Sequence, residues 1–187
     1  MKKETLLFID IQNDYFPGGA FELDGAEAAG RNARLLLDRF REAGRPVVHI
    51  RHESLQPGST FFLPGTPGAD IHPLVAPLPG EPVILKHFPN SFRETGLQME
   101  LDRLGTRRLA VAGMMTLMCV DATVRAAFDL GYELDVVHDA CAARALRFGD
   151  MDIPAQGVHG AFLAALGLVY ARILSTREFL GQDVPRA

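Results

Sequence analysis

The sequence predicts one α/β domain built on a mostly parallel β-sheet, and three observations support this fold class. The chain has 187 residues, 48% of them hydrophobic, which suits a single domain with a substantial core. Short runs rich in Val, Ile and Leu alternate with segments of helical periodicity. Most of these runs are almost continuously apolar, as strands covered on both faces require. We therefore expect residues 1–187 to form one domain of three layers, with helices on both faces of the sheet.

Six segments have the composition of buried strands, because each is short and rich in Val, Ile and Leu. In chain order they are 5–11, 46–52, 82–86, 108–114, 133–139 and 171–175.

Four segments between these strands are predicted to be helices, and each ends in Gly, a common helix terminator. They are 25–44, 93–105, 119–131 and 154–167. The third shows the helical period well, since Val120, Val124 and Phe128 recur on one face. Asp121 and Arg125 share the opposite face, where charge pairs at four-residue spacing are favourable.

Residues 53–81 interrupt this alternation and contain six of the twelve prolines. A structureless loop of this length is uncommon inside a compact domain and usually has a function. We expect this segment to cover a site.

Composition excludes several classes of partner. The net charge is −4 and the chain has no basic run, so nucleic acid and anionic membranes are not expected partners. No apolar run approaches the ~18 residues of a membrane span, and the N-terminus lacks a signal-peptide pattern. Cys119 and Cys141 form neither a disulfide framework nor a zinc-like pattern, which favours a reducing cytoplasm.

Three reactive side chains are predicted at the carboxyl ends of strands, where parallel α/β sheets bind ligands. Asp10 closes "LLFID" near the end of the first strand, Lys86 ends the third strand, and Cys119 follows the fourth at the start of a helix. A helix N-terminus and a nearby ammonium would both favour the thiolate nucleophile. A carboxylate could accept the thiol proton and deliver it to a leaving amine, while backbone N–H groups hold the oxyanion.

Structural roles for the same residues stay open at this point. A cysteine in an apolar run is often a buried small hydrophobe, and a lysine at a strand end is often exposed to solvent. An aspartate at a strand end is often a cap or turn residue.

Three longer motifs resemble the isochorismatase-like cysteine hydrolases, a superfamily that includes nicotinamidase and N-carbamoylsarcosine amidase. The motifs are "LLFIDIQNDYFPGGAFEL" (6–23), "KHFPNSF" (86–92) and "VAGMMTLMCVDATVRAAFDLGYELDVVHDACAA" (111–143). The likeness runs in order to about Thr176. It implies a six-stranded sheet of order 3-2-1-4-5-6, flanked by helices.

The resemblance also implies roles for single residues. Asp10 would be the general base and acid, Lys86 the ammonium that holds the thiolate, and Cys119 the nucleophile. A cis peptide would join Met114 to Met115, so that the N–H groups of Met115 and Cys119 form an oxyanion hole. The reaction would be hydrolysis of an amide, ureido or carbamoyl bond of a small molecule, through a thioester and without a cofactor. Homodimers or homotetramers are common in this family.

Departures from the family pattern narrow these expectations. The segment after the second strand has His49 and His52 but lacks the Asp-x-His that holds a metal in nicotinamidases. Two histidines three apart on a strand point to different faces. We therefore expect no metal site, and nicotinamide is disfavoured as substrate. Cys119 favours C–N cleavage, since isochorismatases that hydrolyse a vinyl ether can lack the cysteine.

Candidate substrate-binding residues come from the same motifs. They are aromatic, amide or thioether side chains near the three strand ends: Phe16, Phe21, Phe88, Asn90, Phe92 and Met118. The sequence does not identify the substrate.

Two other functions are compatible with these residues. A non-catalytic thiol redox sensor or binding module would need an exposed Cys119 and a resolving partner such as Cys141. A phosphatase with Asp10 as nucleophile would need a second carboxylate and Mg²⁺, but Gln12 stands at the two-residue offset.

Overall fold

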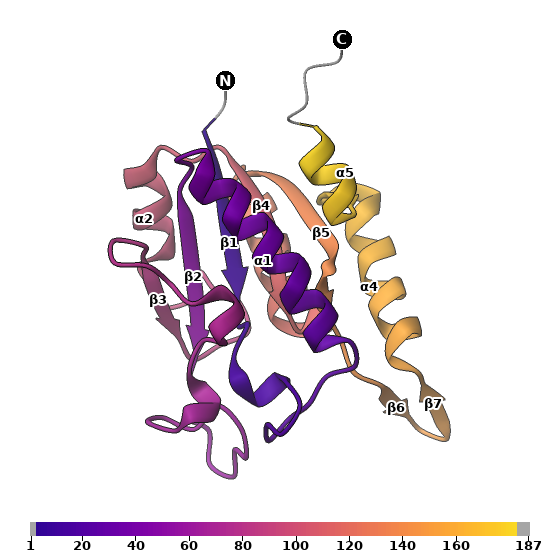
Figure 1. Cartoon of the computed structure of the whole chain (residues 1–187). Coiled ribbons are helices and arrows are strands. Elements are labelled where there is room, and N and C mark those ends of the chain that lie inside the picture. Colours follow the sequence, from indigo (N-terminus) through magenta and orange to yellow (C-terminus); the bar gives the residue numbers. More distant parts are fainter. Residues whose placement is uncertain (1–2, 183–187) are drawn as a thin grey trace.

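The computed structural model describes residues 3–182 and contains a parallel sheet of six strands (Figure 1). The strands are β1 (Glu4–Ile9), β2 (Val47–His52), β3 (Val83–Lys86), β4 (Arg108–Met114), β5 (Glu133–Ala142) and β8 (Arg172–Leu174). Their order is β3-β2-β1-β4-β5-β8, and every neighbouring pair is parallel. The predicted order 3-2-1-4-5-6 is confirmed, with β8 as the sixth strand.

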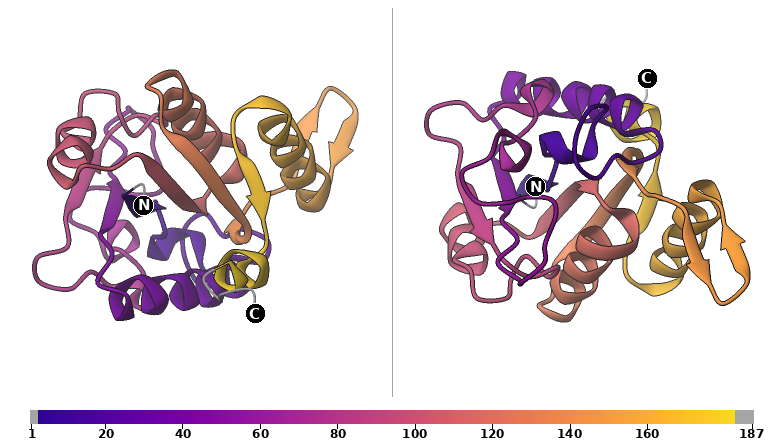
Figure 2. Two further views of the ribbon diagram at one scale, coloured as in Figure 1. Left: turned by 90° about the horizontal axis from the view of Figure 1, so that it is seen from above. Right: turned by 90° about the horizontal axis from the view of Figure 1, so that it is seen from below.

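Helices cover both faces of this sheet, which gives the three layers that the sequence predicts. The α-helices are α1 (Ala26–Glu42), α2 (Leu97–Leu104), α3 (Asp121–Asp129), α4 (Ala155–Val169) and α5 (Thr176–Gly181). In Figure 2, α1 and α5 lie on one face, and α2, α3 and α4 lie on the other. The described residues also form short helical turns, which are η1 (Asn13–Tyr15), η2 (Pro67–Ala69), η3 (Pro73–Val75) and η4 (Thr116–Val120).

The central strand β1 shows why the predicted strands are continuously apolar. Leu6 and Phe8 belong to the hydrophobic cluster beneath α1, whereas Leu7 and Ile9 belong to the cluster beneath α2, α3 and α4. Successive side chains of a strand point to opposite faces, and here both faces are covered. Burial of alternate residues on both sides therefore holds the layers together.

Two observed features were not predicted. A hairpin of β6 (Leu146–Phe148) and β7 (Met151–Ile153) projects from the body (Figure 1). Its strands have three residues each, too few to show a hydrophobic period. Helix α5 was also missed, although Ser175 and Glu178 form a capping box at its start, a recognisable sequence signal.

The carboxyl ends of the strands meet at one edge of the sheet, the lower edge in Figure 1. The segment after β1 and the first part of residues 53–81 lie at this same edge, and the last part of residues 53–81 returns to the opposite edge, where β3 begins. No helix in residues 3–182 is long and apolar enough to cross a membrane.

Candidate active site

Asp10 follows β1 directly and is completely buried. Its backbone has a positive φ of 50°, a left-handed conformation that aspartate tolerates better than most residues. Its N–H donates to the carbonyl of Ile50, 3.2 Å away, which ties the end of β1 to β2. The chain turns sharply at this point, so the carboxylate lies at the edge where the strands end.

Lys86 is the last residue of β3, and only 1% of it is exposed. Its Nζ lies 2.6 Å from Oδ2 of Asp10, with both side chains fully buried. The opposite charges keep the pKa of Lys86 above its ordinary value, although burial by itself lowers it. Lys86 is therefore an ammonium at neutral pH, paired with a carboxylate two strands away.

Cys119 lies in η4, the π-helical turn between β4 and α3, and is 5% exposed. The predicted helix start at this residue is wrong by two positions, because α3 begins at Asp121. Sγ of Cys119 lies within 4.8 Å of a carboxylate oxygen of Asp10 and a ring nitrogen of His52. The fold thus brings the three predicted residues into one buried cluster.

The protonation of Cys119 differs from the expected thiolate. Burial raises the pKa of this thiol, and the charge of Asp10 raises it further; Lys86 acts in the opposite direction but does not compensate. Apart from the ammonium and the thiol, neither carboxylate oxygen of Asp10 has a hydrogen-bond partner within residues 3–182. The cluster therefore rests as a neutral thiol beside a carboxylate with a lone pair free to accept its proton.

His52, which the sequence analysis assigned no role, belongs to the same cluster. It is the register partner of Lys86 in the β2–β3 pair, and paired residues on neighbouring strands project from the same face. Its Nδ1 lies 3.0 Å from Nζ of Lys86 and 4.0 Å from Oδ2 of Asp10. His49 instead contacts Glu81 through Nε2 at 3.0 Å. The two histidines thus have different surroundings, as their three-residue spacing predicts.

Gln12 is a second residue that sequence reasoning missed. Its side chain is fully buried; Nε2 donates to the carbonyls of His52 and Ala69, and Oε1 accepts from the N–H of His52 at 2.7 Å. All these partners are backbone groups, so Gln12 joins the end of β1 to β2 and to the loop. The phosphatase alternative expected a carboxylate here, and the amide serves a structural purpose instead.

Residues 53–81 pack over this edge through Phe62. Its N–H donates to Oδ2 of Asp14 at 2.6 Å, and its ring lies 4.6 Å from that of Tyr15 and 5.9 Å from that of His52. Tyr15 is 2% exposed. Burial raises its pKa well above the ordinary value, so the hydroxyl is protonated.

The turn that carries Cys119 is anchored on both sides. Gly113 has a φ of 147°, and a Cβ there would clash with the backbone of Ile9. The peptide bond between Met114 and Met115 is cis. Oγ1 of Thr116 contacts the carbonyl of Ala142 at 3.1 Å and Nδ1 of His159 at 2.9 Å.

The six candidate substrate-binding residues have varied surroundings. Phe16 is buried and stacks on His72 at 3.6 Å, while Phe21 stacks on Phe61 at 4.3 Å. Arg93 lies over the ring of Phe88 at 3.7 Å.

The other three candidates also differ in what they contact. Oδ1 of Asn90 accepts the N–H of Phe92, and the Phe92 ring packs near Tyr132 at 6.1 Å. Met118 is 44% exposed. Binding roles for all six remain predictions.

Within residues 3–182, Asp10, His52 and Cys119 form a group whose donor atoms lie close enough together to hold a metal ion. However, the Lys86 ammonium already lies 2.6 Å from Asp10 and 3.0 Å from His52. A divalent cation there would have to displace this ammonium or be repelled by it. The donor set is better matched to the ammonium than to a metal.

Comparison with known proteins identifies the family of this chain. Residues 4–156 match the family model of the isochorismatase domain. The chain belongs to the isochorismatase family. The uncharacterised isochorismatase family protein YddQ of Bacillus subtilis is 50% identical over 176 residues, which cover 94% of this chain and 98% of YddQ.

Other isochorismatase-family relatives include an enzyme and a solved structure. Maleamate amidohydrolase of Pseudomonas putida is 30% identical over 157 residues, which cover 76% of this chain and 74% of the amidohydrolase. A crystal structure from Oleispira antarctica, described as an isochorismatase hydrolase, is 49% identical with a TM-score of 0.93. The match covers 96% of this chain and 97% of the chain in that crystal structure. This hydrolase family and its fold confirm the resemblance seen in the sequence.

Proposed function

We propose that this isochorismatase-family chain is a cysteine-dependent hydrolase that cleaves a non-peptide C–N bond of a small molecule through a thioester. One observation carries the proposal: a buried Asp10–Lys86 ion pair at 2.6 Å, with the Cys119 sulfur within 4.8 Å of the same carboxylate. The chain's likeness to an amidohydrolase supports the choice of an amide, ureido or carbamoyl bond.

In the first half-reaction, Asp10 accepts the proton of the Cys119 thiol as the sulfur attacks the substrate carbonyl. A new C–S bond forms, and the carbonyl π electrons move onto oxygen. The N–H groups of Met115 and Cys119 would donate to this oxyanion. The C–N bond then breaks as Asp10 returns the proton to the leaving nitrogen, which leaves a thioester.

In the second half-reaction, Asp10 takes a proton from water, and the resulting hydroxide attacks the thioester carbonyl. The C–S bond breaks, the acid product departs, and the thiol regains the proton. No net charge is created within the cluster at any step, because one proton moves between sulfur and carboxylate beside a permanent ammonium. A constant net charge is important in this site, because burial makes every unpaired charge unfavourable.

Two further features belong to this proposal. Residues 53–81 would form one wall of the substrate site, since Phe62 lies near both Tyr15 and His52. The enzyme would act in the cytoplasm as a homodimer or homotetramer. The projecting hairpin supports self-association, with Phe148 79% and Met151 60% exposed, because solvent-exposed apolar side chains commonly mark interfaces.

The test is a screen of amides, ureido acids and carbamoyl compounds for release of ammonia or amine. Wild type should be active, while Cys119→Ala and Asp10→Asn should abolish turnover and keep a cooperative thermal transition. A thioester should be trapped on Cys119 by mass spectrometry after acid quench. Full activity in Cys119→Ala would exclude the covalent route. A peroxide-induced Cys119–Cys141 bridge in a protein without hydrolytic activity would instead favour the redox sensor.

A further inference from the structure

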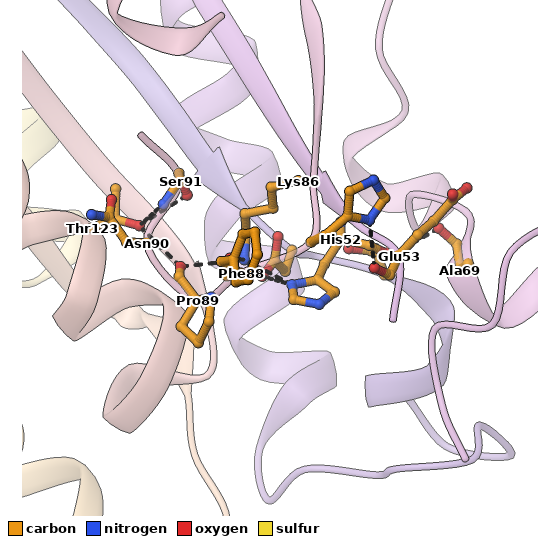
Figure 3. A network of polar contacts seen from close by, with 12 residues as sticks. His52, Glu53, Ala69, Lys86, Phe88, Pro89, Asn90, Ser91 and Thr123 are labelled. Atoms are coloured by element: carbon orange, nitrogen blue, oxygen red, sulfur yellow. Dashed lines mark hydrogen bonds and ion pairs between the residues drawn. The ribbon is translucent and has the colours of Figure 1, made fainter. Parts of the chain in front are cut away.

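His52 is placed beside Lys86 by the register of the sheet and not by sequence proximity. The two residues are partners across β2 and β3, and Figure 3 shows the imidazole reaching the lysine side chain. The ring nitrogen Nδ1 is 3.0 Å from Nζ, while Asp10 approaches the same Nζ at 2.6 Å. His52 thus contacts the one ammonium of the cluster directly.

The hydrogens of the Lys86 ammonium can be assigned to acceptors. An ammonium has three N–H donors and no acceptor. Asp10 takes one and Nδ1 of His52 takes another; the carbonyls of Phe88 and Pro89, at 3.1 and 3.4 Å, compete for the third. Figure 3 shows the Pro89 carbonyl on the side of Lys86 away from His52. Because two hydrogens are committed to side chains, the third is the one that can turn to a thiolate on Cys119.

The imidazole is in the form that this contact needs. Burial lowers the pKa of His52 to about 4, against the opposing charge of Asp10 and with smaller effects of Lys86 and His87. His52 is therefore neutral at pH 7, and a neutral ring that accepts at Nδ1 carries its proton on Nε2. An imidazolium would have no lone pair to offer the ammonium.

The backbone of His52 is held on both sides by Gln12. The N–H of His52 donates to Oε1 at 2.7 Å, and its carbonyl accepts from Nε2 at 2.8 Å. Both groups belong to one buried side chain that follows Asp10 by two residues. The position of the imidazole is therefore coupled to that of the carboxylate it faces across the ammonium.

We propose that His52 is a positioning residue that holds the Lys86 ammonium against Asp10 and Cys119. The inference rests on the proposed function and adds a fourth side chain to it. Without the imidazole acceptor, the ammonium would turn toward the carbonyls of Phe88 and Pro89 and stabilise the Cys119 thiolate less.

The experiment measures Cys119 directly and needs no knowledge of the substrate. In a Cys141→Ala background, Cys119 is the sole cysteine, and its rate of alkylation by iodoacetamide is followed between pH 6 and pH 10. His52→Leu removes the acceptor, while His52→Asn keeps an oxygen near the position of Nδ1. His49→Asn is the matched control, because His49 lies on the same strand but contacts Glu81.

His52→Leu should slow alkylation about tenfold at neutral pH, the size expected for one hydrogen bond to a charged group. His52→Asn should restore most of the rate, and His49→Asn should leave the pH profile unchanged. A His52→Leu protein with a wild-type melting temperature and an unchanged profile would overturn the inference. So would equal loss in the Leu and Asn variants, since that outcome would indicate a role unrelated to the acceptor.

Activity then separates the two proposals. On any substrate found in the screen, His52→Leu should lower kcat with little change in KM, because the ammonium acts on the thiolate. If Cys119→Ala is inactive but His52→Leu is fully active, the hydrolase proposal stands and the role of His52 fails. If no variant and no wild-type preparation hydrolyses a C–N bond, the alkylation profiles still decide the role of His52.

Discussion

Because Asp10 and Lys86 form a buried ion pair, the effects of replacing them on the free energy of unfolding should be strongly non-additive. The perturbation is a double-variant cycle: Lys86→Met, Asp10→Leu and the combination of both. Each substitution replaces a buried charged side chain with an apolar one of comparable size. The side chains concerned have no exposed surface, and their charged atoms are 2.6 Å apart.

The magnitude follows from this geometry. At 2.6 Å and an effective dielectric constant near 20, Coulomb attraction is about 6 kcal/mol. Desolvation of two buried ions costs a similar amount, so the intact pair adds little net stability. Removing one partner leaves the other charge buried and alone, at a cost of about 3–5 kcal/mol. The free energy of unfolding should therefore fall less in the double variant than the two single decreases added together, by at least about 3 kcal/mol.

The assay is urea unfolding at pH 7, monitored by circular dichroism, with the interaction free energy taken from the four proteins. The matched control is the same cycle on Arg34 and Asp38, an ion pair on α1. Its atoms are almost as close, at 2.7 Å, but its side chains are 48% and 41% exposed. Water screens that pair, so its coupling should be close to the measurement error.

Additive losses for Asp10 and Lys86, within about 0.5 kcal/mol, would refute this reasoning. Such a result would mean that the two charges are solvated or apart in solution, and the hydrolase proposal would lose its central observation.

Two further predictions concern the same edge of the sheet. Because the pKa of Lys86 is raised in the folded state, its contribution is complete below the unfolded value of about 10.4 and is lost as pH rises through the folded pKa. The stability difference between wild type and Lys86→Met, measured by urea unfolding from pH 8 to pH 11.5, should therefore narrow above pH ~10.4, and a constant difference would contradict the assignment. Gly113→Ala should destabilise the protein by about 4 kcal/mol or more, since its φ of 147° and the adjacent backbone of Ile9 leave no room for a Cβ; a calorimetric melting temperature within a few degrees of wild type would show that β4 can move away from β1.

Local patterns in the sequence located the six strands of the sheet, although the first strand ends at Ile9 and not at residue 11, and the fifth at Ala142 and not at residue 139. A strand that is buried on both faces needs a continuous apolar run, and this run can be seen in the sequence of the strand itself. Asp10, Lys86 and Cys119 could be grouped from their positions in the chain, because the carboxyl ends of parallel strands meet at one edge. Their distances from one another could not be derived in this way.

The side chains that surround these three residues follow from the tertiary fold alone. His52 joins the cluster because it is paired in register with Lys86, and a shift of one residue would have turned it to the other face. Gln12 gains its role from the backbone of β2, which lies far away along the chain. Register and contact between distant segments are not properties of any local pattern.

The protonation of Cys119 likewise depends on the fold. A helix start and a lysine predict a thiolate, but the surrounding layers remove water and raise the pKa of the thiol. Burial depends on the packing of every layer around the turn, so the sequence could name the nucleophile but not its resting charge.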